Sequence, residues 1–252
     1  MTADRALLPR FWYRALRARL RDGRAEIAAL ADAIRPGDAA ADVGANKGSH
    51  LPWLSRAAGP RGRVVAFEPQ ADLAAYLVRV CRAARLDNVE IQASGVSQRA
   101  GELTLRVPGG GGPSPGASFE ASIARGSPGR ELRVPVVSLD EHFRSEPRRI
   151  AAIKIDVEGH ELAVLRGAVG ILERHAPLLV VELETRHVGD AGVAEALAFL
   201  SERGYDGAFV CRGRLLPVAG FDPSVHQKRS AGRFWDAPGY CNNFVLRSRR
   251  GG

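Results

Sequence analysis

Three residues near position 45 combine a carboxylate with two glycines, a pattern suited to holding a nucleotide-like ligand. Asp42 ends a short apolar stretch, and Gly44 and Gly48 follow it four residues apart. Glycine lets the backbone turn sharply and pass close to a ligand. A helix that begins near Gly48 would direct free N–H groups and its positive dipole end toward a carboxylate or phosphate. Alone, such a turn is also typical of a purely structural link between strand and helix.

A second carboxylate, Glu68, ends the next apolar stretch. It lies beyond Gly48 by about 20 residues, the offset at which an acidic side chain reaches a ribose hydroxyl in nucleotide-binding βαβ units. A carboxylate can accept hydrogen bonds from both hydroxyls of a ribose. The order of strand, turn, helix and acid-ended strand therefore predicts a nucleoside site, and the strand at 89–94 should end near the base.

A third group of charged side chains lies within residues 150–161. Lys154 and Asp156 interrupt an apolar stretch and share one face through the two-residue alternation of a strand. Charges at the end of a buried strand are costly unless they pair or face a solvated cleft. Because parallel sheets bind ligands at the carboxyl ends of their strands, a functional role is favoured for Asp156 and Glu158. A structural Lys154–Asp156 pair is the alternative.

The hydrophobic periodicity predicts an α/β framework that would position these groups. Besides the strands that end at the three acidic sites, strands are expected at 101–107, 132–137, 177–184, 208–210, 215–217 and 243–246. Helices are expected at 49–58, 71–86, 161–175 and 193–203. Residues 108–130 are rich in Gly, Pro and Ser, and they are interpreted as a loop that is either an inert insertion or a cover for the substrate.

The N-terminal residues 1–35 are predicted to form a helical segment ahead of the main domain, residues 36–250. Trp12, Leu16 and Leu20 recur every four residues among arginines, which indicates a basic amphipathic helix at 10–21. The simplest interpretation packs this helix over the core with its arginine stems along the surface. A lid over the substrate and a contact with a membrane surface are the alternatives.

Composition limits the class of protein. The chain has 252 residues, of which 45% are hydrophobic and 25% charged, and this suits one α/β domain with a large core. No apolar run reaches membrane-spanning length and no secretory signal is recognised, so a cytoplasmic location is expected. The net charge of +8 is spread along the chain. Nucleic acid is therefore a less favoured partner than a small molecule.

Together, the motifs at 42–48, 67–69 and 153–161 resemble the FkbM family of S-adenosylmethionine-dependent methyltransferases. The likeness covers roughly residues 35–250, and the stretch Lys-Ile-Asp-Val-Glu-Gly-His-Glu is its most family-specific part. The resemblance implies a doubly wound, Rossmann-like, mostly parallel sheet of seven strands with an antiparallel last strand. It also implies S-adenosyl-L-methionine as cofactor and methyl transfer to a hydroxyl oxygen of a sugar or natural product. The acceptor would be a small molecule or glycan.

Carried over by position, the resemblance implies cofactor contacts from Asp42, Gly44, Asn46, Gly48, Glu68, Ser94 and Asp156. The first four would surround the methionine part, Glu68 would bind the ribose, and Ser94 would lie beside the adenine. Asp156 would lie beside the sulfonium and the acceptor.

A hydroxyl acceptor also needs a base. We expect Asp156 or Glu158 to orient or deprotonate it, together with His187, which follows the acidic strand at 177–184. In the competing interpretations, His187 is a surface residue and Glu158 only accepts backbone hydrogen bonds. No ligand spacing for a metal is recognised, although Asp156, Glu158 and Glu182 could in principle bind a divalent cation. A nucleic-acid methyltransferase, a non-catalytic nucleotide-binding module and a nicotinamide-dependent oxidoreductase are the alternative functions.

Overall fold

Strand β1 (Ala39–Val43) is an interior strand of the main sheet and is buried on both faces. Its alternate side chains enter two different hydrophobic layers: Ala39, Ala41 and Val43 face one, and Ala40 faces the other. This burial on both sides explains why its sequence is apolar apart from Asp42, as expected for a parallel strand covered by helices on both faces. The computed structural model describes residues 2–109, 111–120, 129–230, 232–237 and 239–250.

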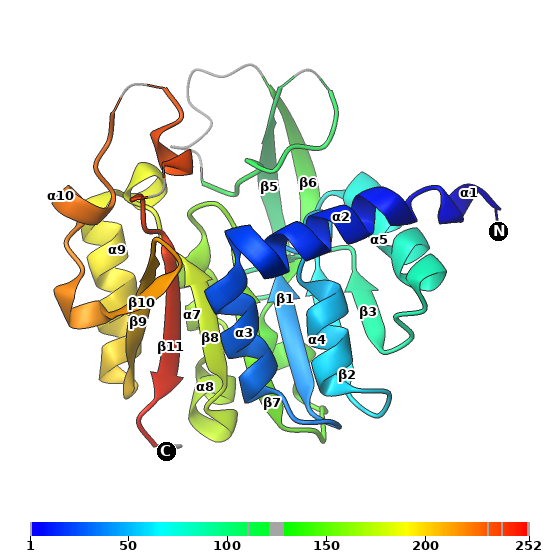
Figure 1. Ribbon diagram of the computed structural model, residues 1–252, viewed down its shortest axis with the longest axis horizontal. Helices are drawn as coiled ribbons and strands as arrows, with labels where there is room; N and C mark the ends of the chain where they lie inside the picture. The colour runs from blue at the N-terminus through cyan, green and yellow to red at the C-terminus, as the bar shows by residue number, and fades with distance from the viewer. Residues whose placement is uncertain (1, 110, 121–128, 231, 238, 251–252) are drawn as a thin grey trace.

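The main sheet has eight strands (Figure 1). From edge to edge they are β10 (Arg214–Pro217), β9 (Tyr205–Cys211), β11 (Asn243–Ser248), β8 (Leu178–Glu182), β7 (Ile150–Ile155), β1, β2 (Arg63–Phe67) and β3 (Val89–Gln92). The last strand, β11, runs antiparallel to both of its neighbours, and β10 runs antiparallel to β9. The predicted doubly wound class and antiparallel last strand are confirmed. The sheet exceeds the expected seven strands because the hairpin partner β10 also joins it at the edge.

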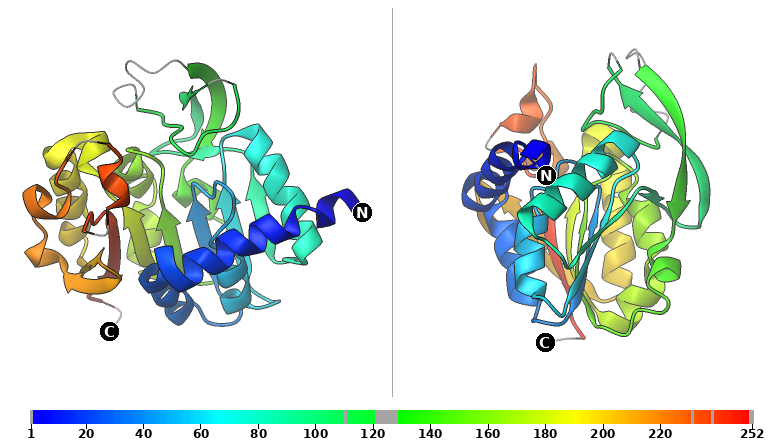
Figure 2. Two further views of the ribbon diagram at one scale, coloured as in Figure 1. Left: turned by 45° about the horizontal axis from the view of Figure 1, so that its top comes forward. Right: turned by 90° about the vertical axis from the view of Figure 1, so that its right-hand side faces the viewer.

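Helices cover both faces of this sheet (Figures 1 and 2). The helices with residues in the layer that contains Ala40 are α2 (Leu8–Arg17), α3 (Arg24–Ala33), α4 (Leu51–Ala58) and α5 (Ala71–Ala84). The opposite layer contains residues of α6 (Leu139–His142), α7 (Glu161–Arg166), α8 (Val169–His175) and α9 (Thr185–Glu202). The remaining short helical elements are α1 (Thr2–Arg5), η1 (Ala18–Asp22), η2 (Val218–Gly220), α10 (Pro223–His226) and η3 (Phe234–Asp236).

A separate sheet of three strands rises above the carboxyl edge of the main sheet (Figure 2). It consists of β4 (Gly95–Val96), β5 (Gly101–Pro108) and β6 (Gly129–Val137). The strands predicted at 101–107 and 132–137 are thus confirmed, and they pair antiparallel with each other. Of the loop predicted at 108–130, residues 110 and 121–128 lie outside the described part of the chain.

Three expected helices differ in detail. The helix after the glycine turn begins at Leu51 and not near Gly48, because residues 45–50 are used by turns. The helix expected at 161–175 is interrupted at Gly167 and Ala168 between α7 and α8. Helix α9 begins before the predicted residue 193, and it has a kink at Gly189, where φ is 71°.

The N-terminal helix exists, but it buries a different face from the expected one. Phe11 and Ala15 are fully buried, whereas Leu16 and Leu20 are 46% and 72% exposed. The Trp53 indole donates a hydrogen bond to the Ala15 carbonyl at 3.1 Å, which fixes this orientation. In Figure 1, α2 crosses the carboxyl end of β1, so the segment lies close to the predicted site. No described helix is long and apolar enough to cross a membrane.

Candidate functional site

The glycine turn after β1 is shaped mainly by its contacts with the rest of the chain. Gly44 has φ of +78°, and a Cβ added there would lie 1.8 Å from the Asp156 carbonyl oxygen. Gly48 has φ of +75°, and a Cβ there would lie 2.8 Å from a methyl group of Leu77. We expected these glycines to make room for a ligand. In the structure, glycine is needed at both positions because the backbone is left-handed there and because a side chain would clash with the end of β7 or with α5.

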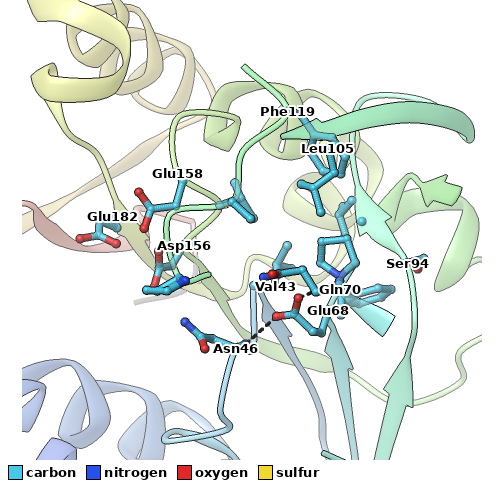
Figure 3. Close-up of a pocket in the computed structure, with 18 residues that line it drawn as sticks. Val43, Asn46, Glu68, Gln70, Ser94, Leu105, Phe119, Asp156, Glu158 and Glu182 are labelled. Atoms are coloured by element: carbon cyan, nitrogen blue, oxygen red, sulfur yellow. Dashed lines mark hydrogen bonds between the residues drawn. The ribbon is translucent and has the colours of Figure 1, made fainter. Parts of the chain in front are cut away.

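Glu68 is held in place by two backbone N–H groups. Its Oε2 accepts a hydrogen bond from Asn46 N and its Oε1 accepts one from Gln70 N, both at 2.9 Å (Figure 3). Asn46 has φ of +48°, a conformation that few residues other than glycine adopt and that directs its N–H toward the carboxylate. Burial raises the pKa of Glu68 although these hydrogen bonds lower it. Each oxygen has a further lone pair for a ligand hydroxyl.

Glu68 forms one wall of a cavity of about 180 Å³ at the carboxyl ends of β1, β2 and β3. Gln70, Ser94, Leu105 and Phe119 also line it (Figure 3). Nine of the lining residues are apolar and seven are polar, so the cavity offers both apolar surface and hydrogen-bond partners to a heteroaromatic ligand.

Residues 115–120, which we call the cover segment, close this cavity from above. Pro115, Ala117 and Phe119 line the cavity. The Ser118 hydroxyl donates to the Glu158 carbonyl at 2.6 Å, and Glu120 contacts His160 Nδ1 at 2.7 Å. These two contacts tie the cover segment to the turn after β7. The part of the 108–130 loop that is described therefore belongs to the cavity wall.

Lys154 is the centre of a buried charged cluster below the cavity. Its Nζ lies 3.4 Å from Asp42 Oδ1 and 3.2 Å from Asp156 Oδ2, and it donates to the Gly44 carbonyl at 3.1 Å. Burial would lower the pKa of Lys154, but the two carboxylates outweigh this effect and raise it. The ammonium group therefore connects the glycine turn to β7. The Lys154–Asp156 pair of the alternative interpretation is present, together with Asp42 as a third member.

Asp156 and Glu182 form a carboxyl pair with opposite protonation. Burial alone would raise the pKa of Asp156, but the Lys154 ammonium and a hydrogen bond from Glu182 lower it to about 2. Burial and the negative charge of Asp156 raise the pKa of Glu182 well above its ordinary value. The raised pKa of Glu182 favours its protonated form, in which it can donate a hydrogen bond to the Asp156 carboxylate.

Glu158 occupies a left-handed backbone conformation with φ of +54° and lines the first cavity. Its Oε2 lies 3.0 Å from His187 Nε2, and the His187 side chain is only 4% exposed. His187 is therefore not the surface residue of the competing interpretation. It contacts Glu158 and does not line either of the two cavities.

A second cavity, of about 890 Å³, adjoins the first. Both are lined by Gly44, Asn46, Pro115, Asp156 and Glu182, so these residues mark the place where the cavities meet. The far wall comes largely from α2 and the segment after it, through side chains that include Arg10, Tyr13, Arg14 and Arg17.

The structure brings together most of the residues predicted for the site. Those that line a cavity are Gly44, Asn46, Glu68, Ser94, Asp156 and Glu158. The predicted residues that do not line either cavity are Asp42, Gly48 and His187. Asp42 is fully buried beneath the floor of the cavity, where it forms an ion pair with Lys154. Gly48 packs against Leu77.

Sequence reasoning did not find several residues of the cavity walls. Gln70 lies two residues after Glu68 in the sequence, and this short distance was the available signal. Its side chain forms two hydrogen bonds of 2.9 Å with the backbone of Ser114. His50 lines the second cavity, and burial lowers its pKa, which keeps the imidazole neutral. Phe119 and Tyr13 have no distinctive neighbours in the sequence.

The donor set suits a nucleoside attached to an amino-acid-like group. Asn46 Oδ1 is buried at the junction of the cavities and has no hydrogen-bond partner among the described residues, so it could accept a hydrogen bond from an ammonium group. Glu68 could accept the two ribose hydroxyls in the smaller cavity. No group of three or more His, Cys, Asp or Glu among the described residues is arranged to hold a metal ion.

Comparison with known proteins places this geometry in a wider context. The profile described as "Methyltransferase FkbM domain" matches residues 42–206. No curated protein matches the chain in sequence at a significant level.

Several solved structures share the fold. Methyltransferase FkbM from Methylobacillus flagellatus is 17% identical with a TM-score of 0.52, over 96% of this chain and 59% of that one. The chain therefore spans about three fifths of the length of that protein. Cofactor-bound Rv0187 from MTB is 18% identical with a TM-score of 0.52, over 98% and 91% of the two chains. An rRNA methylase from Streptococcus thermophilus is 14% identical with a TM-score of 0.50, over 88% and 93%.

Proposed function

The chain belongs to the FkbM methyltransferase family. From this premise we propose that it is an S-adenosylmethionine-dependent methyltransferase that methylates a hydroxyl oxygen of a sugar or natural-product small molecule. The observation that carries the proposal is the position of Asp156. It lines both cavities where they meet, between the nucleoside-sized cavity and the larger one. An acceptor in the larger cavity would therefore meet the reactive end of the cofactor beside Asp156.

We assign the smaller cavity to the adenosine part of the cofactor. Glu68 would accept hydrogen bonds from the ribose hydroxyls, and Ser94 and Phe119 would border the adenine. Asn46 and Gly44 would lie beside the methionine part. Bound S-adenosylmethionine supplies an activated methyl group on a positively charged sulfur. The protein's task is then to align the acceptor with that group and to exclude water.

Asp156 would orient the acceptor. Because its pKa is lowered to about 2, it remains an anion and can accept a hydrogen bond from the acceptor hydroxyl. The same low pKa makes Asp156 a weak base. Glu158, backed by His187 at 3.0 Å, is the better candidate to take up the hydroxyl proton.

The larger cavity suits an acceptor of sugar or natural-product size. Its volume of about 890 Å³ lies within the range of small-molecule sites. Its lining offers both hydrogen-bond donors and acceptors. They come from Tyr13 and Arg14 of α2 and from Ser49 and His50, which follow the glycine turn. The N-terminal residues 1–35 would thus act as a wall of the acceptor site, and residues 36–250 would form the cofactor-binding domain.

Two measurements test the proposal in sequence. Calorimetric titration should detect binding of S-adenosylmethionine and of its demethylated product, and no binding of NAD. Incubation with labelled cofactor and a panel of sugars, glycans and hydroxylated natural products should then give a product whose label is released from oxygen by ether-cleaving reagents. Label found only on nitrogen, carbon or sulfur would refute O-methylation while leaving methyl transfer intact.

A nucleic-acid acceptor is the second candidate. The observation that favours it is the group of arginines along the larger cavity, Arg10, Arg14 and Arg17, in a chain of net charge +8. Binding of RNA or DNA whose affinity falls steeply with salt would support this acceptor. Against it, Arg17 is paired with Asp22 at 2.6 Å, and no stacked row of aromatic side chains follows the cavity in the part of the chain that the structure describes.

A further inference from the structure

The N-terminal helix presents an apolar ridge to solvent, formed by Trp12, Leu16 and Leu20. These side chains are 36%, 46% and 72% exposed. They follow one another at intervals of four residues along α2 and η1. Of the seven large hydrophobic side chains that are exposed in the described chain, four lie between residues 12 and 20, with Tyr13 as the fourth. Such a concentration marks an interaction surface, because exposed apolar residues are otherwise scattered singly.

The ridge cannot be turned inward by a small rotation of the helix. Phe11 and Ala15 on the adjacent side of α2 are fully buried. The Trp53 indole donates a hydrogen bond of 3.1 Å to the Ala15 carbonyl, and the Phe11 ring packs close to Gly48. The exposed position of the ridge is therefore a consequence of how α2 is anchored to the main domain.

Positive charge surrounds the ridge. Residues 1–24 contain seven arginines and two aspartates. Both aspartates are already paired: Asp22 contacts Arg17 at 2.6 Å, and Asp4 contacts Arg79 at 2.7 Å. Among the described side chains, no ion pair involves Arg10, Arg19 or Arg24. Within α2, 100° between successive residues places Arg10 and Arg17 on one flank of the ridge. Arg19 lies in η1, next to Leu20.

We propose that this ridge docks the protein on the surface of an anionic lipid bilayer. Trp12 and the two leucines would enter the interface between headgroups and acyl chains, while the flanking arginines would contact lipid phosphates. Tryptophan favours this region of a membrane. A nucleic acid would use the arginines and would gain little from exposed leucines. A protein partner would require acidic charge around an apolar groove.

Docking would also determine where the larger cavity faces. Arg10, Tyr13 and Arg14 of the same helix line that cavity. The cavity would therefore lie beside the lipid surface, although the docking itself does not depend on the identity of the methyl acceptor.

Co-sedimentation with large vesicles tests the proposal directly. The full chain is mixed with vesicles of phosphatidylcholine alone or of phosphatidylcholine with phosphatidylglycerol, at about 0.1 M salt, where charges still act over roughly 10 Å. We expect binding to the anionic vesicles and weak or no binding to the neutral ones. The double variant Leu16→Ser/Leu20→Ser should lower the affinity by roughly tenfold or more, because two apolar side chains no longer enter the lipid.

A matched control separates the ridge from general surface hydrophobicity. Leu215 and Val225 are 48% and 63% exposed on another part of the molecule. The variant Leu215→Ser/Val225→Ser should bind vesicles as the unchanged protein does. Arg19→Gln should weaken binding by about fivefold, and added salt should weaken it further. Thermal unfolding and titration with S-adenosylmethionine verify that each variant is folded.

Three results would overturn the proposal. One is equal binding to neutral and anionic vesicles, or no binding to either. Another is unchanged binding by the Leu16→Ser/Leu20→Ser variant. The third is preferential binding to RNA that the ridge variant retains, which would assign the arginines to a nucleic acid.

Discussion

At the scale of single residues, Asp156 and Glu182 are in hydrogen-bond contact but differ in charge. Lys154 stabilises the anion on Asp156, and Glu182 holds the proton. We expect Asp156→Asn to lower kcat by about 100-fold or more, because the acceptor hydroxyl loses its charged hydrogen-bond partner. Affinity for S-adenosylmethionine should change by only a few fold. Steady-state kinetics and calorimetry measure the two effects separately.

The matched variant is Glu182→Gln. Because the raised pKa of Glu182 favours its neutral form, the amide keeps a donor and the size of the side chain, and kcat should fall by less than about tenfold. An Asp156→Asn enzyme with full activity would remove the role assigned to Asp156. Equal losses in both variants would mean that the pair acts only through its structure.

Glu68→Gln is expected to weaken cofactor binding. A neutral amide can accept hydrogen bonds through only one of its two terminal atoms, so it cannot serve both backbone N–H groups and both ribose hydroxyls. We expect the dissociation constant for S-adenosylmethionine to rise by about 10- to 100-fold. Glu131, which is 61% exposed on the small sheet, provides a control, and Glu131→Gln should leave the dissociation constant unchanged. Unchanged affinity in Glu68→Gln would place the ribose elsewhere.

The sequence carried enough information to identify Glu68 but not all of its surroundings. Its distance from the glycine turn is a local property of a βαβ unit, so spacing alone predicted it. Phe119 and Tyr13 reach the cavities from segments far away in the sequence, and no local pattern encodes such contacts. For Asp42, the sequence predicted a ligand contact. Register explains the difference, because Asp42 lies directly opposite Lys154 on the neighbouring strand.

At the scale of elements, the glycine turn and the turn after β7 form one packed unit. The variant Gly44→Ala should unfold at lower temperature, because its Cβ would lie 1.8 Å from the Asp156 carbonyl oxygen and φ is +78°. We expect a loss of unfolding free energy of more than about 3 kcal/mol. Chemical denaturation followed by circular dichroism measures this loss.

The variant Gly213→Ala provides a control that separates the effect of backbone strain from the effect of the steric clash. Gly213 has φ of +72°, and a Cβ added there would meet no atom within 4 Å, so Gly213→Ala should lose only about 1 kcal/mol. If both variants lost the same free energy of unfolding, the clash with the Asp156 carbonyl oxygen would contribute nothing to the destabilisation of Gly44→Ala.

The attachment of the cover segment to the turn after β7 should affect the affinity for S-adenosylmethionine. In Ser118→Ala, the 2.6 Å hydrogen bond to the Glu158 carbonyl is lost, so Phe119 is held less firmly over the cavity. We expect the dissociation constant for S-adenosylmethionine to rise by roughly three- to tenfold. Ser114 offers a control, because its bonds to Gln70 use only the backbone atoms of Ser114. Ser114→Ala should bind normally, and equal affinity of the two variants would contradict an attachment role for Ser118.

Most elements were predictable because their patterns are local. Residues 63–68 and 150–156 are largely apolar and end in acids, and they form β2 and β7, the two neighbours of β1 in the sheet. The N-terminal helix was also found, but its buried face was assigned to Trp12, Leu16 and Leu20. Periodicity gives the presence of an amphipathic helix, and it does not tell which of two apolar sides meets the core. Here Phe11 and Ala15 meet it, because the Phe11 ring packs beside Gly48 and the Trp53 indole at the start of α4 donates a hydrogen bond to the Ala15 carbonyl.

At the scale of the whole molecule, buried acids should make stability depend on pH. Burial raises the pKa of Glu161 from its ordinary 4.5 to about 7, although hydrogen bonds from Val157 N and Gly159 N lower it. Between these two pH values the folded chain binds more protons than the unfolded chain. Its stability should therefore fall as pH rises through this window.

Glu161→Gln removes this titration and keeps an oxygen that can accept both backbone hydrogen bonds. The variant should lose less stability than the unchanged protein between about pH 5 and pH 8, by up to about 3 kcal/mol. Unfolding free energies at several pH values measure the difference. Glu182, whose pKa is also raised, acts in the same direction and remains in both proteins. Parallel pH profiles of the two proteins would show that Glu161 titrates normally.

The central position of β1 has a consequence for how the chain is made. One edge of β1 pairs with β2, where Ala39 lies opposite Arg63, but its other edge pairs with β7, where Ala39 lies opposite Ile150. During synthesis at about 5–20 residues per second, that second edge has no partner for roughly 5 to 20 s after Ala39 is made. An unpaired apolar strand edge is prone to aggregation. The nascent chain therefore passes through an interval in which we expect a chaperone to raise the yield of folded protein.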